Sequence, residues 1–153
     1  ATTWWDTNDA TFEITGVQLE VGDTATDFEH RSYAEELVRC QRYCYKIDSP
    51  DATTNTSVFG IAFVRANNTF RWGHQWPQKM RTAPSLSVSA GSHFKVFDGS
   101  ASEICNTVVI DNASAFSANI SFGSSGTGMN VGRGCQVYAN DTQIGWILLS
   151  AEL

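Results

Sequence analysis

From residue 57 onward the chain alternates apolar and polar side chains, and this pattern constrains the fold more than any other feature. Alternation at a period of two is typical of strands with one buried face. No helical period follows residue 48, and the spacing of the runs is that of antiparallel sandwiches and jelly rolls. About eight strands are predicted, over residues 57–65, 69–76, 85–90, 94–97, 105–110, 115–122, 130–139 and 143–151. In the sixth, the residues expected to point inward are Phe116, Ala118, Ile120 and Phe122.

Residues 11–21 predict one further strand, TFEITGVQLEV, with a bulge at Gly16 where the alternation slips. A lone strand is unstable because its backbone groups and its apolar face need partners. We therefore expect it to be the end strand of an upstream β-unit, and the chain to be a piece of a longer protein.

A single helix is predicted over residues 33–44. Ser32 and Glu35 have the spacing of a capping box at its start. About three turns are too short to persist alone in water, so the apolar stripe must dock against the β-domain or a neighbouring subunit. The stripe, at i, i+4, i+7 and i+11, consists of Tyr33, Leu37, Cys40 and Cys44.

These patterns predict a mainly β protein in three parts. Residues 1–27 hold the end strand of the upstream β-unit, 28–48 form a helical connector, and 49–153 form an antiparallel, jelly-roll-like β-sandwich. Only 17% of the 153 residues are charged, which suits a sandwich with small polar turns. The net charge of -6 and the scattered basic residues disfavour nucleic acid, and without a long apolar run we expect no membrane insertion.

The four cysteines, Cys40, Cys44, Cys105 and Cys135, are most simply interpreted as reduced, buried thiols. A bridge between Cys105 and Cys135 stays open. Zinc sites want four ligands, and the Cys40–Cys44 pair has no second pair to complete one. We therefore predict neither a metal site nor a cofactor.

The run FRWGHQW places Trp72, His74 and Trp76 on one face of a strand. This row could stack against sugar rings, with Arg71 and Gln75 supplying hydrogen bonds, and these five residues are the candidate contacts for a glycan or another receptor. The simpler alternative is that the aromatic row forms the inward face of the sandwich, with His74 a satisfied core or interface residue.

No catalytic motif is found in the sequence, which lacks GxSxG, P-loop, HExxH and acidic calcium-loop patterns. Glycoside hydrolysis needs two carboxyl groups on opposite sides of one sugar bond. No such pair is distinguished among the acidic residues Glu13, Glu20, Asp98, Glu103, Asp111 and Asp141. We therefore predict a protein that is not an enzyme.

One segment resembles a known family. Residues 12–47, FEITGVQLEVGDTATDFEHRSYAEELVRCQRYCYKI, are similar to a segment of tail fibres, tailspikes and related virion proteins of tailed bacteriophages. There a strand like ITGVQLEVG ends a sandwich, and a linker, a helix and a C-terminal β-domain follow. MRTAPSLSVS at 80–89 and GWILLSAEL at 145–153 also resemble later pieces, in the same order. Asp27 replaces a frequent proline, and Cys44 replaces an aromatic residue.

The resemblance implies a homotrimeric tail-fibre region in the virion, made in the cytoplasm of the bacterial host. Its expected partners are two further copies, other tail proteins, and a host-surface glycan or protein. The stripe Tyr33, Leu37, Cys40 and Cys44 would then be the helix-docking or trimer contact. The resemblance supplies no catalytic residue. Alternatives are a structural virion protein such as a capsid decoration or tail adaptor, a polysaccharide depolymerase, and a secreted host lectin.

Overall fold

The computed structural model describes residues 11, 13–24, 26–49, 57–140 and 144–152. Contacts divide the chain into two units, residues 1–33 and 34–153, which are described separately. In the first unit the described residues before Tyr33 form neither helix nor strand, so the strand predicted over 11–21 is wrong for the described residues there. The reason is the one that makes a lone strand unstable, since no strand among the described residues pairs with this segment. Residues 1–10 lie outside the described part.

In the first unit, side-chain hydrogen bonds connect the described residues, and backbone hydrogen bonds between strands do not. The Glu20 carboxylate accepts hydrogen bonds from the backbone N–H and the hydroxyl of Thr26, both at 2.6 Å. The Gln18 side chain donates to Glu20 at 3.1 Å and accepts from the backbone N–H of Glu29 at 2.8 Å. The bonds from Thr26 lower the pKa of Glu20. Leu19 and Val21 remain fully exposed, so this unit buries little apolar surface of its own.

Helix α1 spans Tyr33–Gln41 and begins directly after Ser32, as predicted. It ends three residues earlier than predicted, with the backbone N–H of Tyr43 donating to the Cys40 carbonyl at 2.9 Å. The chain then becomes strand β1, Cys44–Asp48, because pairing with a strand at the far end of the sequence replaces further helical bonds. Cys44 therefore lies on a strand. Among the described residues, no helix has the length and apolar character needed to cross a membrane.

All eight predicted C-terminal strands are present, with boundaries shifted by a few residues. They are β2 Val58–Ala66, β3 Thr69–Gln75, β4 Ser85–Val88, β5 Phe94–Phe97, β6 Ser102–Ala113, β7 Ser117–Ser124, β8 Gly134–Ala139 and β9 Trp146–Ser150. A short 3-10 turn, η2 Gly91–His93, precedes β5.

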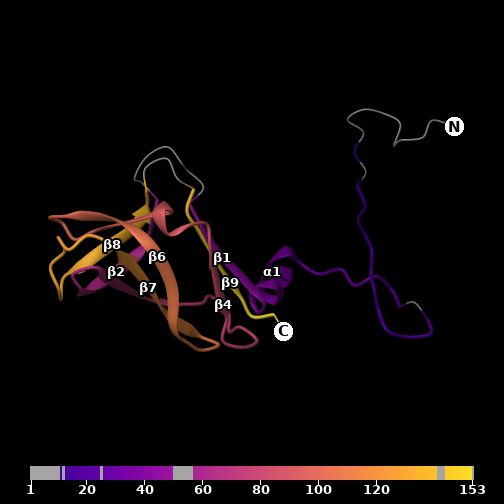
Figure 1. Cartoon of the computed structure of the whole chain (residues 1–153). Helices are drawn as coiled ribbons and strands as arrows, with labels where there is room; N and C mark the ends of the chain where they lie inside the picture. The colour runs from indigo at the N-terminus through magenta and orange to yellow at the C-terminus, as the bar shows by residue number, and fades with distance from the viewer. Residues whose placement is uncertain (1–10, 12, 25, 50–56, 141–143, 153) are drawn as a thin grey trace. The chain divides into compact units, whose positions relative to one another are not determined.

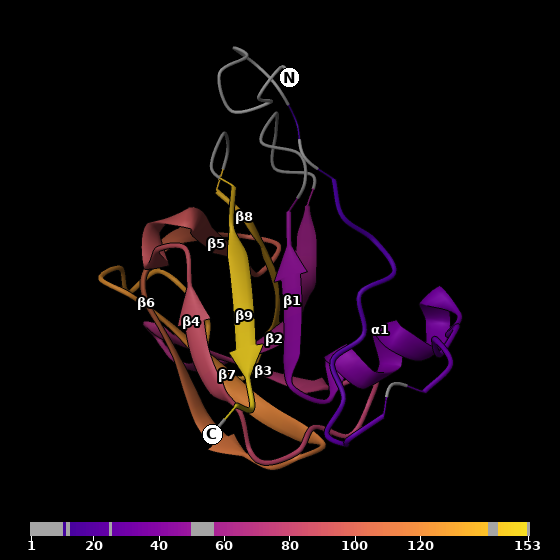
Figure 2. The same ribbon diagram turned by 90° about the vertical axis from the view of Figure 1, so that its right-hand side faces the viewer.

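The mainly β, antiparallel class is confirmed, but the jelly-roll-like sandwich is not. Strands β2-β3-β7-β6-β5-β8 close into a six-stranded barrel, and β1-β9-β4 form a separate three-stranded sheet. In Figures 1 and 2 this sheet runs along one side of the barrel, with β9 between β1 and β4. The barrel closes because β8 pairs with both β2 and β5, which leaves none of the six strands with a free edge.

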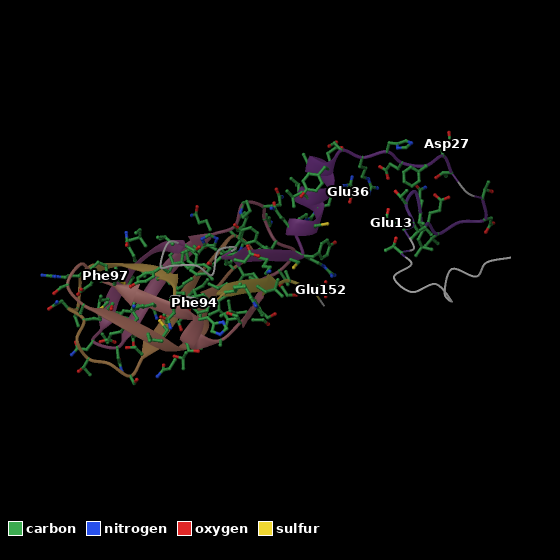
Figure 3. All side chains as sticks on the ribbon, turned by 90° about the horizontal axis from the view of Figure 1, so that it is seen from above. Glu13, Asp27, Glu36, Phe94, Phe97 and Glu152 are labelled. Atoms are coloured by element: carbon green, nitrogen blue, oxygen red, sulfur yellow. The ribbon has the colours of Figure 1, made fainter. Side chains whose placement is uncertain are left out.

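One core joins the barrel and the three-stranded sheet. Its fully buried side chains include Phe70, Phe94 and Phe122 of the barrel and Ile147 and Leu149 of β9. In Figure 3, Phe94 lies within the β-domain while Phe97, three residues along the same strand, lies at its edge. The two sides of β5 thus show the alternation on which the sequence prediction rested.

The cysteines follow the prediction only in the core. Cys105 and Cys135 are buried and free. Burial raises the pKa of Cys105 to about 12 and that of Cys135 to about 11, so both stay protonated at neutral pH. Cys40 and Cys44 are exposed, which corrects the expectation that they are buried. The cause is that α1 buries none of its residues and that Cys44 lies on the outward side of β1.

Trp72 packs directly on Gly60 of the neighbouring strand. Trp72 is 5% exposed, and an ideal Cβ on Gly60 would lie 2.5 Å from its Nε1 atom. Both residues face inward, so the missing side chain on β2 makes the space that the indole ring occupies.

We expect the substitution Gly60→Ala to lower the free energy of unfolding by about 1–3 kcal/mol, because the new methyl group overlaps a buried ring that cannot swing away. Gly134→Ala is the matched control, since Gly134 lies on the adjacent β8 with no atom within 4 Å of an added Cβ. Chemical denaturation of both variants measures the difference. Equal stability of the two variants would contradict this packing.

Candidate functional site

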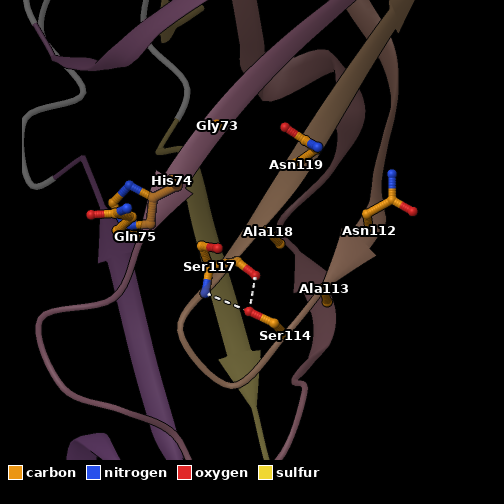
Figure 4. Close-up of a pocket in the computed structure, with 9 residues that line it drawn as sticks. All are labelled: Gly73, His74, Gln75, Asn112, Ala113, Ser114, Ser117, Ala118 and Asn119. Atoms are coloured by element: carbon orange, nitrogen blue, oxygen red, sulfur yellow. Dashed lines mark hydrogen bonds between the residues drawn. The ribbon is translucent and has the colours of Figure 1, made fainter.

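A polar groove lies on the outer face of the barrel, across β3, β7 and β6. Its volume is about 730 Å³, within the range of small-molecule sites. Figure 4 shows the residues that line it: Gly73, His74, Gln75, Asn112, Ala113, Ser114, Ser117, Ala118 and Asn119. Amides and hydroxyls dominate this lining, and none of the nine residues is an Asp, Glu, Lys or Arg.

Gly73 forms the floor of the groove. Phe70 and Trp72 of β3 point inward, so the alternate positions Arg71, Gly73 and Gln75 face outward. Gly73 is exposed and pairs with Asn119 of β7. A residue without a side chain between two long ones leaves the backbone open, and a glycine inside a strand often marks a place where another group approaches closely.

A β-bulge brings two residues of β6 opposite Asn119. Ile110 pairs with Ile120 and Ala113 with Ala118, so Asp111 and Asn112 together face the single residue between them on β7. Bulges of this kind redirect side chains and are frequent next to functional sites. Here the bulge places the Asn112 amide at the same groove as the Asn119 amide.

The turn from β6 to β7 closes one end of the groove. The Ser114 hydroxyl accepts hydrogen bonds from the backbone N–H groups of Phe116 at 3.2 Å and Ser117 at 3.1 Å. Phe116 was expected to point inward, but it is 59% exposed because it belongs to this turn and not to β7. The ammonium group of Lys79 lies 5.0 Å from the centre of its ring.

An ion pair flanks the groove on the same outer face. The Asp111 carboxylate accepts hydrogen bonds from the Arg71 guanidinium and, at 2.5 Å, from the Ser121 hydroxyl. The bond from Ser121 first, and then Arg71, holds the pKa of Asp111 below its usual range. The aspartate therefore stays ionised at neutral pH and neutralises the Arg71 guanidinium beside the groove.

His74 lies among aromatic rings at the end of β3. Its ring centroid is 4.6 Å from that of Trp72, 5.5 Å from that of Trp76, and 6.0 Å from that of Tyr45, on which it stacks. Burial lowers the pKa of His74, because the aromatic surroundings disfavour its charged form. Its Nε2 atom is buried without a hydrogen-bond partner among the described residues.

The candidate receptor contacts are separated by the two faces of β3. Trp72 and Trp76 are 5% and 7% exposed, so the inward, core interpretation of these two rings is supported. Arg71 pairs with Asp111, and Gln75 reaches the groove. Five residues of the groove were not predicted from the sequence: Gly73, Asn112, Ser114, Ser117 and Asn119. An outward glycine in a predicted strand was a usable signal for the first of them.

The predicted docking stripe is not covered by the β-domain. No residue of α1 is buried: Tyr33 is 82% exposed and Leu37 is 41% exposed. Cys40 and Cys44 are exposed as well. The apolar side of the helix is thus available for a contact outside the described part of this chain.

The acidic residues of the β-domain mainly secure loops. The Asp98 carboxylate accepts hydrogen bonds from the backbone N–H groups of Ser100 and Ala101, at 2.9 and 2.8 Å, which strongly lower its pKa. Glu103 accepts from the Ser124 hydroxyl and the Gly128 backbone. The described residues contain no group of three potential metal ligands, and Asp141 lies outside them. What the groove offers is neutral hydrogen bonding.

Comparison with protein-family models, with curated proteins and with solved structures finds no match to this chain.

We expect the free energy of unfolding to fall between pH 7 and pH 5 because of His74. A lowered pKa in the folded state means that the unfolded chain takes up the proton first, near the ordinary value of about 6.5, so stability is lost as the pH falls from there through the folded pKa. His74→Phe should reduce this loss and keep the aromatic stack, whereas Asn119→Ala should leave it unchanged. Denaturation at several pH values is the measurement, and an unaltered pH dependence in His74→Phe would contradict the assignment.

Proposed function

We propose that this chain is the C-terminal region of a tailed-bacteriophage tail fibre, a non-enzymatic homotrimer that attaches the virion to a glycan or protein on the host surface. The observation that carries the proposal is the order of elements around FEHRSYAEELVRCQRY. Helix α1 begins inside this segment, and an antiparallel β-domain follows it, as the resemblance implies. The sheet β1-β9-β4 shares one core with the barrel. A core between two β-layers is also a feature of a jelly-roll-like sandwich, and it supports the same proposal.

The exposed side of α1 supports the trimer. A nine-residue helix is too short to be stable alone, and Leu37 and Val38 remain 41% and 45% exposed. The β-domain of the same chain does not bury these side chains. A sister chain can cover them in a fibre, and Leu19 and Val21 of the first unit have the same need for a partner.

The groove supports a recognition role. It is open to solvent, uncharged and rich in amides, and it lies on a closed barrel. Such a site can hold a ligand by hydrogen bonds without a chemical step. A structural virion protein is the alternative, and its position on the particle distinguishes it from an adhesin.

The purified protein should have three times the 16.8 kDa mass of one chain. Leu37→Glu should shift the mass toward one chain, because a charge on the apolar stripe cannot be buried between copies. Arg39→Gln, on the opposite side of α1, should keep the trimer. Light scattering with size-exclusion chromatography measures the masses, and a wild-type protein of single-chain mass would contradict the trimer.

Fluorescently labelled protein should bind saturably to the bacterium in which virions carrying this chain propagate, and it should compete with those virions for adsorption. Linked copies give the avidity that weak single sites lack. Antibody labelling of particles should mark the tail fibres. A trimer that adheres to no such cell, together with labelling over the capsid lattice, would remove the adhesin role and favour the structural alternative.

A further inference from the structure

We propose that the groove over Gly73 is a binding site for an uncharged saccharide. The inference rests on the proposed host-recognition function and names the site and the ligand class for it. The two tryptophans of the aromatic row do not belong to this site, because Trp72 and Trp76 are buried in the core, whereas His74 lines the groove.

The floor of the groove accommodates a flat ring. The exposed Gly73 lies between the outward side chains of Arg71 and Gln75 on one strand and beside Asn119 on the next. A Cβ added at Gly73 would meet only the Asn119 Oδ1 atom, at 3.7 Å. The open backbone therefore allows the C–H face of a sugar ring to approach to van der Waals contact.

The walls of the groove carry side-chain amides from each of three strands. The side-chain amides of Gln75, Asn112 and Asn119 make no hydrogen bond to another described side chain, although they lie on three adjacent strands of one closed barrel. Each amide offers one acceptor oxygen and two N–H donors. The hydroxyls of a sugar also both donate and accept hydrogen bonds. Three such amides can therefore satisfy a pyranose more fully than they can satisfy a ligand that only donates or only accepts.

The charge of the surroundings selects a neutral ligand. Arg71 already pairs with Asp111, which Ser121 also binds, so the flanking cation is neutralised. The nine lining residues include no lysine or arginine, and the chain carries a net charge of -6. A phosphate or a sugar carboxylate would therefore meet no positively charged side chain among the residues that line the groove, and the Lys79 ammonium at its end is already held over the Phe116 ring.

The test compares wild type with Gly73→Val on an array of neutral hexose and N-acetylhexosamine oligosaccharides and of sialylated and phosphorylated ones. Wild type should bind neutral members only, and Gly73→Val should lose at least about tenfold in affinity, because the branched side chain fills the floor. Gly134→Val, the same change at an outward glycine of β8, should bind as wild type does. Asn119→Ala, which needs no added volume, should lose about three- to tenfold through its missing hydrogen bonds.

Binding that Gly73→Val and Asn119→Ala leave unchanged would overturn the inference, as would binding of acidic members alone or of no member. Thermal unfolding of each variant excludes a loss of fold as the cause. Host adsorption separates the two proposals. If Gly73→Val adheres to cells as well as wild type, the groove is not the recognition site and the recognition function stands. If the groove binds neutral sugars but wild type adheres to no host cell, the saccharide site stands and the recognition function is wrong.

Discussion

The two-sided strand β3 is the element on which the rest of the structure depends. Its inward side chains include Phe70 and Trp72, which lie in the core. The indole ring of Trp72 packs on Gly60, where a side chain would overlap it. Its outward positions deliver Arg71, Gly73 and Gln75 to the groove. Because side chains alternate strictly along a strand, the packing of Trp72 fixes where Gly73 can lie. A slip of one residue would bury the arginine and expose the tryptophan, so the core enforces the geometry of the outer face.

The bulge in β6 adds what alternation cannot supply. In a regular ladder, Asp111 and Asn112 would point to opposite faces, one of them into the core. With the bulge, both lie opposite Asn119 at the surface, and the ladder resumes at Ala113 and Ala118. The ion pair with Arg71 then ties β6 to β3 across β7. An irregularity in one strand thus concentrates polar groups where a regular sheet would spread them, and closure of the barrel limits how far they can move.

The sequence predicted the local features well and the non-local ones poorly. Period-two alternation located all eight C-terminal strands, and the start of α1 followed from Ser32. The end of α1 was wrong because β1 is specified by pairing with β9, about a hundred residues away in the chain. Barrel closure depends on β8 joining β2 and β5, which no local pattern encodes. The aromatic row lies on the strand that also lines the groove, but Trp72 and Trp76 are on the inward face of that strand. The sequence could not decide this, since burial depends on what packs above a face.

The shallow groove and the exposed helix explain each other if the chain works as an oligomer. An open site that holds a neutral ligand by a few amide hydrogen bonds gains little free energy per copy, because each bond replaces one to water. A single copy would then detach quickly from a surface. Joining copies through the apolar side of α1 requires no change in the barrel, and it converts each further binding event into an intramolecular one. The low charge of the chain fits this arrangement, since apolar and neutral polar surfaces can approach their copies without large desolvation costs. In such an oligomer a single groove would need to supply only selectivity among neutral sugars, and the strength of attachment would come from the number of grooves that are held together.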